Sequence, residues 1–332
     1  MKERLAHLKA HLDRRPWLLP AASFAFGWLS FALVQRGERL ASIVAILALI
    51  GWPWIFFEAA MGRLIVARSK GRLSIGAVRF VTQQIEQEIL FFALPFLFTA
   101  SPFVPGQIVF LALASGIALL TTLDPIYYHR IAPHAGLASA LHAYCTFIAA
   151  LVVLPIAAHL PADKALPVAM GFTVVTLAAS VPRMLAATEG TFKKLAGLFG
   201  LPLVLAMGWN VRNWIPPAGL WVREARITDR VENLQPGERV ARLSAATLTA
   251  QGLHAFVAVR APQGLSQAVV FEWRWKGVVV DRIPAQVSGG REEGFRTYSR
   301  KQNFPADPRG GWIVDLKTPA QQVVARMRFE VE

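Results

Sequence analysis

The chain has 332 residues, of which 54% are hydrophobic and 17% are charged, and its mean hydropathy is +0.41. This composition is more apolar than that of ordinary soluble proteins, so it excludes a chain built only from water-soluble domains and makes the lipid bilayer its first expected partner. The formal net charge of +14 is compatible with nucleic-acid binding. Basic residues beside membrane helices explain that charge more simply through cytoplasmic retention, so we expect no nucleic-acid partner.

Seven apolar runs near twenty residues predict helices that cross a membrane, because unpaired backbone groups are costly in hydrocarbon. The runs cover residues 17–34, 41–61, 85–104, 107–123, 137–158, 165–185 and 195–214. The first run follows a basic stretch, as in a signal peptide, but it is long for one, and we interpret it as an uncleaved helix. The sequence therefore predicts a multi-pass helical domain over residues 1–215 and a soluble domain over residues 216–332.

Lysine and arginine are distributed unevenly between alternate connections. The N-terminus and residues 62–80, 124–136 and 183–194 hold five, five, one and three of them, whereas the intervening connections hold two, none and one. Because cytoplasmic segments retain positive charge, the N-terminus is predicted to lie in the cytoplasm. Seven crossings then place the C-terminal domain outside it. For a protein of a bacterial inner membrane, that location is the periplasm.

In the C-terminal domain the hydrophobic period becomes two, which is typical of half-buried strands. In one run Phe271, Trp273 and Trp275 share a face, while Glu272 and Arg274 lie on the other. Similar runs lie near 222–229, 239–247, 252–260, 278–287, 294–301, 311–316 and 322–331. Their number and the turn signals between them predict an antiparallel β-sandwich of immunoglobulin-like architecture.

Four motifs of this domain follow one another in a characteristic order. They are Phe271-Glu-Trp-Arg-Trp275, Phe295-Arg-Thr-Tyr-Ser-Arg-Lys301, Gly311-Trp-Ile-Val-Asp315 and Phe329-Glu-Val331. Through them the chain resembles the bacterial family of unknown function DUF2914 over roughly its last 110 residues. The membrane part resembles, in its layout, the DUF5924 region that often precedes such a domain.

One turn departs from the pattern of the DUF2914 family. Its members usually carry a glycine after the Gly-Trp strand, whereas this chain has Thr318-Pro-Ala320, which leaves the geometry of that hairpin open. The resemblance implies no reaction, ligand or cofactor.

Basic and aromatic side chains alternate along the strand that starts at Phe295. Arg296, Tyr298 and Arg300 are expected to share one face, because side chains alternate along a strand. Together with Arg274 on another strand, they could bind phosphate, acidic glycan or lipid headgroups. The alternative is a solvated outer face whose charges limit aggregation.

Two further features bear on ligand binding by this domain. Trp312 follows two glycines and is a candidate platform for a ligand, although tryptophan in a sandwich strand more often belongs to the core. From residue 211 onward the chain holds 18 Lys and Arg against 12 Asp and Glu, which indicates an acidic partner. The expected partners are an anionic lipid, an acidic glycan or an envelope protein.

A belt of polar residues is predicted near the cytoplasmic ends of the helices. It consists of Glu58, Gln83, Glu86, Gln87, Asp124, His129, His134 and His142, with Tyr127 beside them. Gln83, Glu86 and Gln87 are three and four residues apart, so they line one face of a helix. Ionisable residues at membrane depth indicate an ion, proton or headgroup site, whereas residues at helix ends can simply reach interfacial water. A metal site would need histidine and carboxylate ligands in a recognisable spacing, which is absent, so we expect no metal.

The sequence contains no catalytic motif, phosphate-binding glycine loop or cofactor signature. Its only cysteine, Cys145, lies in an apolar run, so no disulfide is expected. We therefore predict an envelope protein without enzymatic activity, whose sandwich binds a protein partner or an anionic component. The alternative hypothesis is a transporter or processing protein for a small molecule or lipid, with the polar belt as its site.

Overall fold

The computed structural model describes residues 75–186 and 206–332, together with residue 190 and isolated positions between 21 and 32. It divides into two compact units. The described residues of the first unit are 75–96, 112–153, 168–186 and 206–207, and the second unit consists of Leu97–Leu111, Leu154–Pro167 and Gly208–Glu332. The predicted span at 41–61 and most of those at 17–34 and 195–214 lie outside the described residues.

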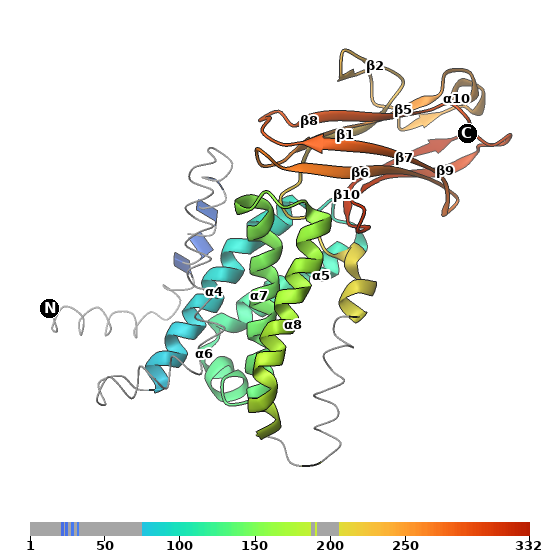
Figure 1. Cartoon of the computed structure of the whole chain (residues 1–332). Coiled ribbons are helices and arrows are strands. Elements are labelled where there is room, and N and C mark those ends of the chain that lie inside the picture. Colours follow the sequence, from blue (N-terminus) through green and yellow to red (C-terminus); the bar gives the residue numbers. More distant parts are fainter. Residues whose placement is uncertain are drawn as a thin grey trace. The chain divides into compact units, whose positions relative to one another are not determined.

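Four long helices carry the apolar runs of the described part (Figure 1). They are α4 (Ile75–Thr99), α5 (Pro105–Thr122), α7 (Ala135–Ala157) and α8 (Ala162–Ala186). Between α5 and α7 lie the short α6 (Asp124–Ile126) and the π-helix η1 (Tyr127–Ile131). Within the described residues, α5, α7 and the Ala162–Val181 part of α8 are long and apolar enough to cross a membrane.

These three helices coincide with the runs predicted at 107–123, 137–158 and 165–185, so the part of the chain that the structure describes supports three of the seven predicted spans. The helix predicted at 85–104 differs in both bounds, since α4 begins at Ile75 and ends at Thr99. Residues 75–84, with Gln83 and Gln84 among them, therefore belong to the helix as well. They can do so because Gln83, Glu86 and Gln87 are buried against other helices.

α7 is the most enclosed of the three candidate spans. In its most apolar stretch 72% of the residues are buried, against 28% in α5 and in α8. Pro155 lies inside α7 and Pro95 inside α4, as membrane helices tolerate. Cys145 is a free, fully buried thiol on α7.

The strands of the second unit form two main sheets, drawn as stacked orange and red layers in Figure 1. The three-stranded sheet has the order β1 (Trp221–Thr228), β5 (Leu253–Arg260) and β8 (Phe295–Lys301). The five-stranded sheet has the order β4 (Arg242–Leu243), β10 (Val323–Val331), β9 (Gly310–Lys317), β6 (Ser266–Trp275) and β7 (Val278–Ser288). Every pairing in these sheets is antiparallel except that of β4 with β10. A separate small pair joins β2 (Val231–Glu232) to β3 (Gln235–Pro236).

The inner faces of the two sheets enclose one apolar core. Its largest fully buried side chains include Trp273, Trp312 and Phe271. The indole N–H of Trp273 donates to Ser299 Oγ at 2.9 Å, so this hydrogen bond ties β6 in one sheet to β8 in the other. The alternation predicted for Phe271–Trp275 therefore places the apolar face in the core.

The strand predicted at 239–247 is wrong over most of its length. Only Arg242–Leu243 forms a strand, and residues from Ala245 form the helix α10 (Ala245–Gln251). Ser244 caps this helix by accepting a hydrogen bond from the Thr247 N–H, and Gly252 ends it with a φ of 71°. A serine cap followed eight residues later by a helix-ending glycine is a helix signal, which the period-two hydrophobicity of this segment outweighed in the prediction.

The hairpin between β9 and β10 forms without the family's usual glycine. Gln321 adopts the left-handed conformation with a φ of 68°. Its N–H donates to the Thr318 carbonyl, while the Thr318 N–H donates to the Gln322 carbonyl. The turn thus places its left-handed residue one position after the Thr-Pro-Ala segment.

Candidate functional site

A pocket opens in the second unit where an edge of one sheet meets an incompletely covered strand of the other. β1 is an edge strand of the three-stranded sheet. β10 is covered by β4 only at Glu330 and Val331, because β4 has just two residues. The side of β10 at residues 326–328 is therefore left open, and the pocket beside it has a volume of about 270 Å³.

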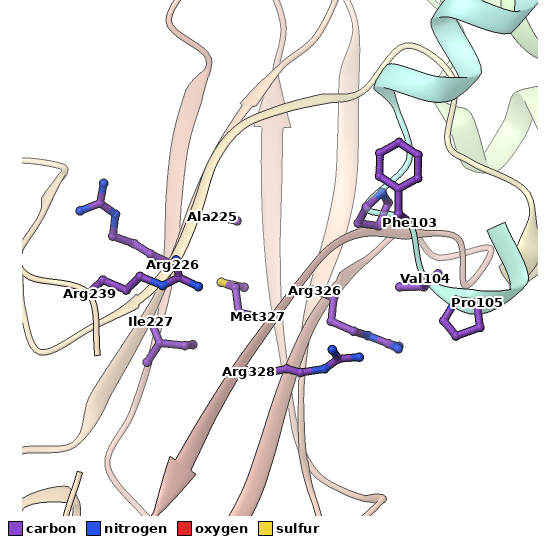
Figure 2. Close-up of a pocket in the computed structure, with 11 residues that line it drawn as sticks. Phe103, Val104, Pro105, Ala225, Arg226, Ile227, Arg239, Arg326, Met327 and Arg328 are labelled. Carbon is purple, nitrogen blue, oxygen red and sulfur yellow. The ribbon is translucent and has the colours of Figure 1, made fainter. Parts of the chain in front are cut away.

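Four arginines line this pocket, and no acidic side chain does so among the described residues. They are Arg226 on β1, Arg239 after β3, and Arg326 and Arg328 on β10. Figure 2 shows Arg226 beside Arg239 and Arg326 beside Arg328, with Met327 between the two pairs. We call this cavity the arginine pocket.

Two of these guanidinium groups are already paired. Arg326 donates through Nε and Nη2 to the two carboxylate oxygens of Asp315, at 2.6 and 2.8 Å. Asp315 is fully buried, and its hydrogen bond raises the pKa of Arg326 above the usual value of an arginine. Arg226 forms an ion pair with Glu224. Both side chains are therefore held in place before any ligand arrives.

The other two guanidinium groups lack an acidic partner in the part of the chain that the structure describes. Arg239 and Arg328 are exposed, and neither forms an ion pair there. Arginine presents several N–H donors in a planar fork that matches phosphate and carboxylate oxygens. The pocket therefore combines fixed positive charge with free donors, which suits an anionic ligand.

A row of charges crosses the outer face of the five-stranded sheet and supports Arg326. In register across four strands lie Arg282 of β7, Glu272 of β6, Asp315 of β9 and Arg326 of β10. Arg282 donates to Glu272 at 3.2 Å. The two carboxylates lie side by side between the two arginines and pair with basic side chains of the same sheet. They therefore do not line the pocket.

Glu272 is the best-compensated member of this row. Its Oε1 accepts from Lys317 Nζ at 2.7 Å and from Arg274 Nε at 2.6 Å. Burial would raise the pKa of Glu272, but the hydrogen bonds and positive charges of Lys317 and Arg274 outweigh it and lower the pKa to about 2. The carboxylate is therefore ionised at all physiological pH values.

The connection between α4 and α5 forms an apolar wall of the pocket. Pro102, Phe103, Val104 and Pro105 belong to it. The wall is tied to β10 by Gln107, whose Nε2 donates to the Val323 carbonyl at 2.9 Å. Ser101 also belongs to this network, since its hydroxyl donates to Gln107 Oε1 at 2.9 Å and accepts from the Phe103 N–H at 3.0 Å.

The predicted anion row and Arg274 do not lie together. Arg296, Tyr298 and Arg300 belong to β8 of the three-stranded sheet, whereas Arg274 belongs to β6 of the five-stranded sheet. The guanidinium of Arg274 donates a hydrogen bond to Glu272, and that of Arg296 donates to Glu293 at 3.2 Å. Tyr298 is exposed and its ring lies 5.9 Å from that of His254. The predicted alternation along the strand holds, but the four residues do not form one site.

Trp312 does not offer a surface to a ligand. Only 1% of it is exposed. Its ring stacks between Trp275 and Phe329, with centroid distances of 6.0 and 5.7 Å. Its indole N–H donates to the Pro308 carbonyl at 2.8 Å. Its role is therefore that of a core residue, and we do not retain it in the candidate site.

The polar belt forms a hydrogen-bonded network in the first unit. The carboxylate of Glu86 on α4 receives the Tyr127 hydroxyl at 2.8 Å and lies 2.5 Å from His142 Nδ1 on α7. Gln83 Nε2 donates to the Thr121 carbonyl and to Asp124, and Gln87 Nε2 donates to the same carbonyl of Thr121. Tyr127 opens the π-helix η1, a distortion that often marks functional sites. The network thus joins five helical elements, namely α4, α5, α6, η1 and α7.

Not every predicted member of the belt joins this network. His129 and His134 are exposed, and each ring contacts a carbonyl four residues earlier in its own chain segment. Glu58 lies outside the described residues. Within the described part, no group of three or more His, Cys, Asp and Glu side chains is arranged to hold a metal ion.

Two oxygens of the network carry no hydrogen bond from any residue that the structure describes. They are Gln83 Oε1 and Gln87 Oε1, on side chains that are at most 1% exposed. Buried carbonyl oxygens of this kind are costly unless a donor or cation reaches them. Sequence spacing had indicated that these glutamines share a face, and the structure shows which helices that face contacts.

The arginine pocket was not predicted from the sequence. Its arginines come from three separate segments, and only Arg326 and Arg328 show a local signal, as alternate residues of one strand. The same signal had selected Arg296 and Arg300 instead. What distinguishes the two rows is that Arg326 and Arg328 line a pocket together with arginines of two other segments, and this arrangement depends on long-range pairing.

Two family models match the chain in the predicted order. The model of DUF5924, a family of unknown function, matches residues 1–255, and that of DUF2914, a protein of unknown function, matches residues 266–331. No curated protein matches the chain. The first match ends within β5 and the second begins at the start of β6. The arginine pocket takes Arg226 and Arg239 from the first match and Arg326 and Arg328 from the second. Because the first match covers more than half of its residues, the chain belongs to the DUF5924 family and carries a DUF2914 region at its C-terminal end.

Proposed function

We propose that this chain is a membrane-anchored binding protein whose sandwich holds an anionic component of the cell envelope in the arginine pocket. The observation that carries the proposal is the pairing of two fixed arginines with two free ones, without an acidic side chain among the described lining residues. Charged side chains also protect open sheet edges from aggregation. Edge protection alone does not require a cavity, and it does not require a buried carboxylate behind one of the arginines.

The proposal includes the topology of a bacterial inner-membrane protein with seven spans, a cytoplasmic N-terminus and a periplasmic, immunoglobulin-like sandwich. Contacts within the second unit support the sidedness. The α4–α5 connection reaches β10 through Gln107, and the α7–α8 connection reaches β6 through Asp163, which accepts from Gln267 at 2.7 Å. The connection between α5 and α7 belongs to the first unit. Alternate connections therefore group with the C-terminal domain, as alternate membrane sides require.

A reporter fusion tests the sidedness. Alkaline phosphatase fused after Glu332 is expected to be active, because this enzyme folds outside the cytosol. A fusion within the α5–α7 connection, after His134, is the matched control and is expected to be inactive. The reverse pattern would overturn the topology.

Anion binding by the full-length protein in neutral detergent tests the site. The probes are inorganic phosphate, glycerophosphoglycerol and polygalacturonate, titrated by microscale thermophoresis. The variant Arg239→Gln/Arg328→Gln is expected to bind at least about tenfold more weakly than the parent, as the loss of charge-assisted hydrogen bonds predicts. The control Arg296→Gln/Arg300→Gln removes the same charge and should bind within about twofold of the parent. Equal loss in both variants would show that net charge, and not the pocket, attracts the anion.

The second candidate function is transport or processing of a small molecule or lipid by the helices. The observation that favours it is the Glu86 network, with two buried amide oxygens that the described residues leave unpaired. Glu86→Gln and Arg239→Gln/Arg328→Gln should then be compared in a cellular phenotype. Loss of function confined to Glu86→Gln would favour the helices over the sandwich.

A further inference from the structure

The arginine pocket lies at the start of a helix that could cross a membrane. Pro105, one of its lining residues, is the first residue of α5. The next turns of α5 expose Ile108, Val109 and Leu113, which suit contact with lipid. Because the end of a spanning helix lies at the level of the headgroups, the pocket is placed where phosphates of lipids occur.

Two tryptophans mark the same level from another segment of the second unit. Trp209 and Trp214 are 45% and 40% exposed. A Cβ added at Gly106 would clash with the ring of Trp214, so that ring packs directly against the start of α5. The guanidinium of Arg212 lies 4.9 Å from the centroid of Trp209. Exposed tryptophan with nearby arginine is typical of the membrane–water interface.

Phe103 places an exposed apolar ring on the wall of the pocket. It is 55% exposed and has a φ of 54°. This left-handed conformation costs a bulky residue about 1 kcal/mol or more, and a glycine there would avoid the cost. An apolar contact beside the pocket would explain why the chain carries phenylalanine at a position that favours glycine.

The pocket is also too small for a large polar ligand. Its volume of about 270 Å³ lies just below the range of about 300–1,000 Å³ for pockets that enclose drug-sized molecules. It can hold a headgroup, while the remainder of the ligand lies outside. The ligand is then anionic at one end and apolar where it leaves the pocket beside Phe103.

We propose that the arginine pocket binds the phosphate of an anionic phospholipid headgroup at the membrane surface, with the lipid chains passing Phe103. This inference rests on the proposed anion-binding function and specifies its ligand. Arg239 and Arg328 donate to the phosphate oxygens, Asp315 positions Arg326 beside them, and Gln107 holds the apolar wall against β10.

The test compares a lipid with its own headgroup. The full-length protein in neutral detergent is titrated with dioleoyl phosphatidylglycerol, with glycerophosphoglycerol and with dioleoyl phosphatidylcholine, and occupancy is read by native mass spectrometry. Phosphatidylglycerol should bind at least about tenfold more tightly than glycerophosphoglycerol, because it adds apolar contact to the same charge. The affinity for phosphatidylglycerol should also exceed that for phosphatidylcholine, whose choline group carries a compensating positive charge.

Two variants separate the parts of the site. Arg239→Gln/Arg328→Gln should weaken the binding of both phosphatidylglycerol and glycerophosphoglycerol about tenfold. Arg296→Gln/Arg300→Gln should weaken the binding of neither. Phe103→Gly suits the left-handed backbone at that position. It should weaken only the binding of phosphatidylglycerol, by about threefold or more.

The outcomes distinguish the two proposals. If glycerophosphoglycerol binds as tightly as the lipid and Phe103→Gly changes neither, the lipid assignment is wrong while anion binding stands. If neither ligand binds the parent protein, both proposals fail. If Arg296→Gln/Arg300→Gln weakens the lipid as much as the pocket variant, the ligand lies elsewhere on the sandwich.

Discussion

The helical network and the arginine pocket differ in whether the protein itself supplies partners for their charged side chains. In the network, both oxygens of the Glu86 carboxylate have partners, Tyr127 and His142, within the first unit. In the pocket, Arg239 and Arg328 lack acidic partners in the described part of the chain. A charge in an apolar surrounding must be compensated by the protein itself. A charge at an open sheet edge is solvated by water and stays available for a ligand. The comparison therefore separates charge that stabilises the fold from charge that is free to bind.

The largest expected effect concerns charge that stabilises the sandwich. Glu272→Ala leaves Lys317, whose side chain is 9% exposed, without its carboxylate partner. Breaking such a buried pair costs about 3–5 kcal/mol of unfolding free energy. Thermal unfolding of the full-length protein, followed by tryptophan fluorescence, should show a large decrease in Tm. The control Glu293→Ala removes a carboxylate that is 82% exposed and should change stability by less than about 0.5 kcal/mol.

The same carboxylate predicts a dependence of stability on pH. The pKa of Glu272 is lowered in the folded protein to about 2 from an ordinary value of 4.5. Its contribution is therefore fully present above about pH 4.5 and is lost as the pH falls toward 2. Acid titration of the parent should show this loss, and Glu272→Gln should flatten the curve over that window. A curve of unchanged slope in Glu272→Gln would contradict the assignment.

The next effect concerns the helical network. Glu86→Ala removes the acceptor of the Tyr127 hydroxyl and the partner of His142, and it should cost about 3 kcal/mol. Tyr127→Phe removes one donor and should cost about 1 kcal/mol. Helix unfolding measured by far-UV circular dichroism checks both values. Tyr128→Phe, on the neighbouring half-buried ring, is the matched control, and an equal decrease there would argue against the network.

A smaller effect is expected from the wall of the pocket. Gln107→Leu leaves the Val323 carbonyl and the Ser101 hydroxyl without their partner, at a cost of about 1–2 kcal/mol. Gln302→Leu, at an exposed position, should stay within about 0.5 kcal/mol. Because Gln107 fixes the wall, its replacement should also weaken anion binding. Unchanged binding in a protein of lowered Tm would show that the wall does not shape the site.

Sequence reasoning located most strands and the helices at 107–123, 137–158 and 165–185, because hydrophobic period and run length follow directly from burial. It also placed Gln83, Glu86 and Gln87 on one face, since i, i+3 and i+4 spacing is local. It failed at 239–247, where a capped helix follows two strand residues. It failed at the pocket as well, because no local pattern shows that β4 ends after Leu243 and leaves β10 open.

The identity of the ligand site has one direct test, which is to locate a bound anion. Crystals of the full-length protein soaked with selenate would place the anion by the anomalous scattering of selenium. We expect a selenium position within hydrogen-bond distance of the guanidinium groups of Arg239 and Arg328. A position beside Arg296 and Arg300, with the arginine pocket empty, would contradict it.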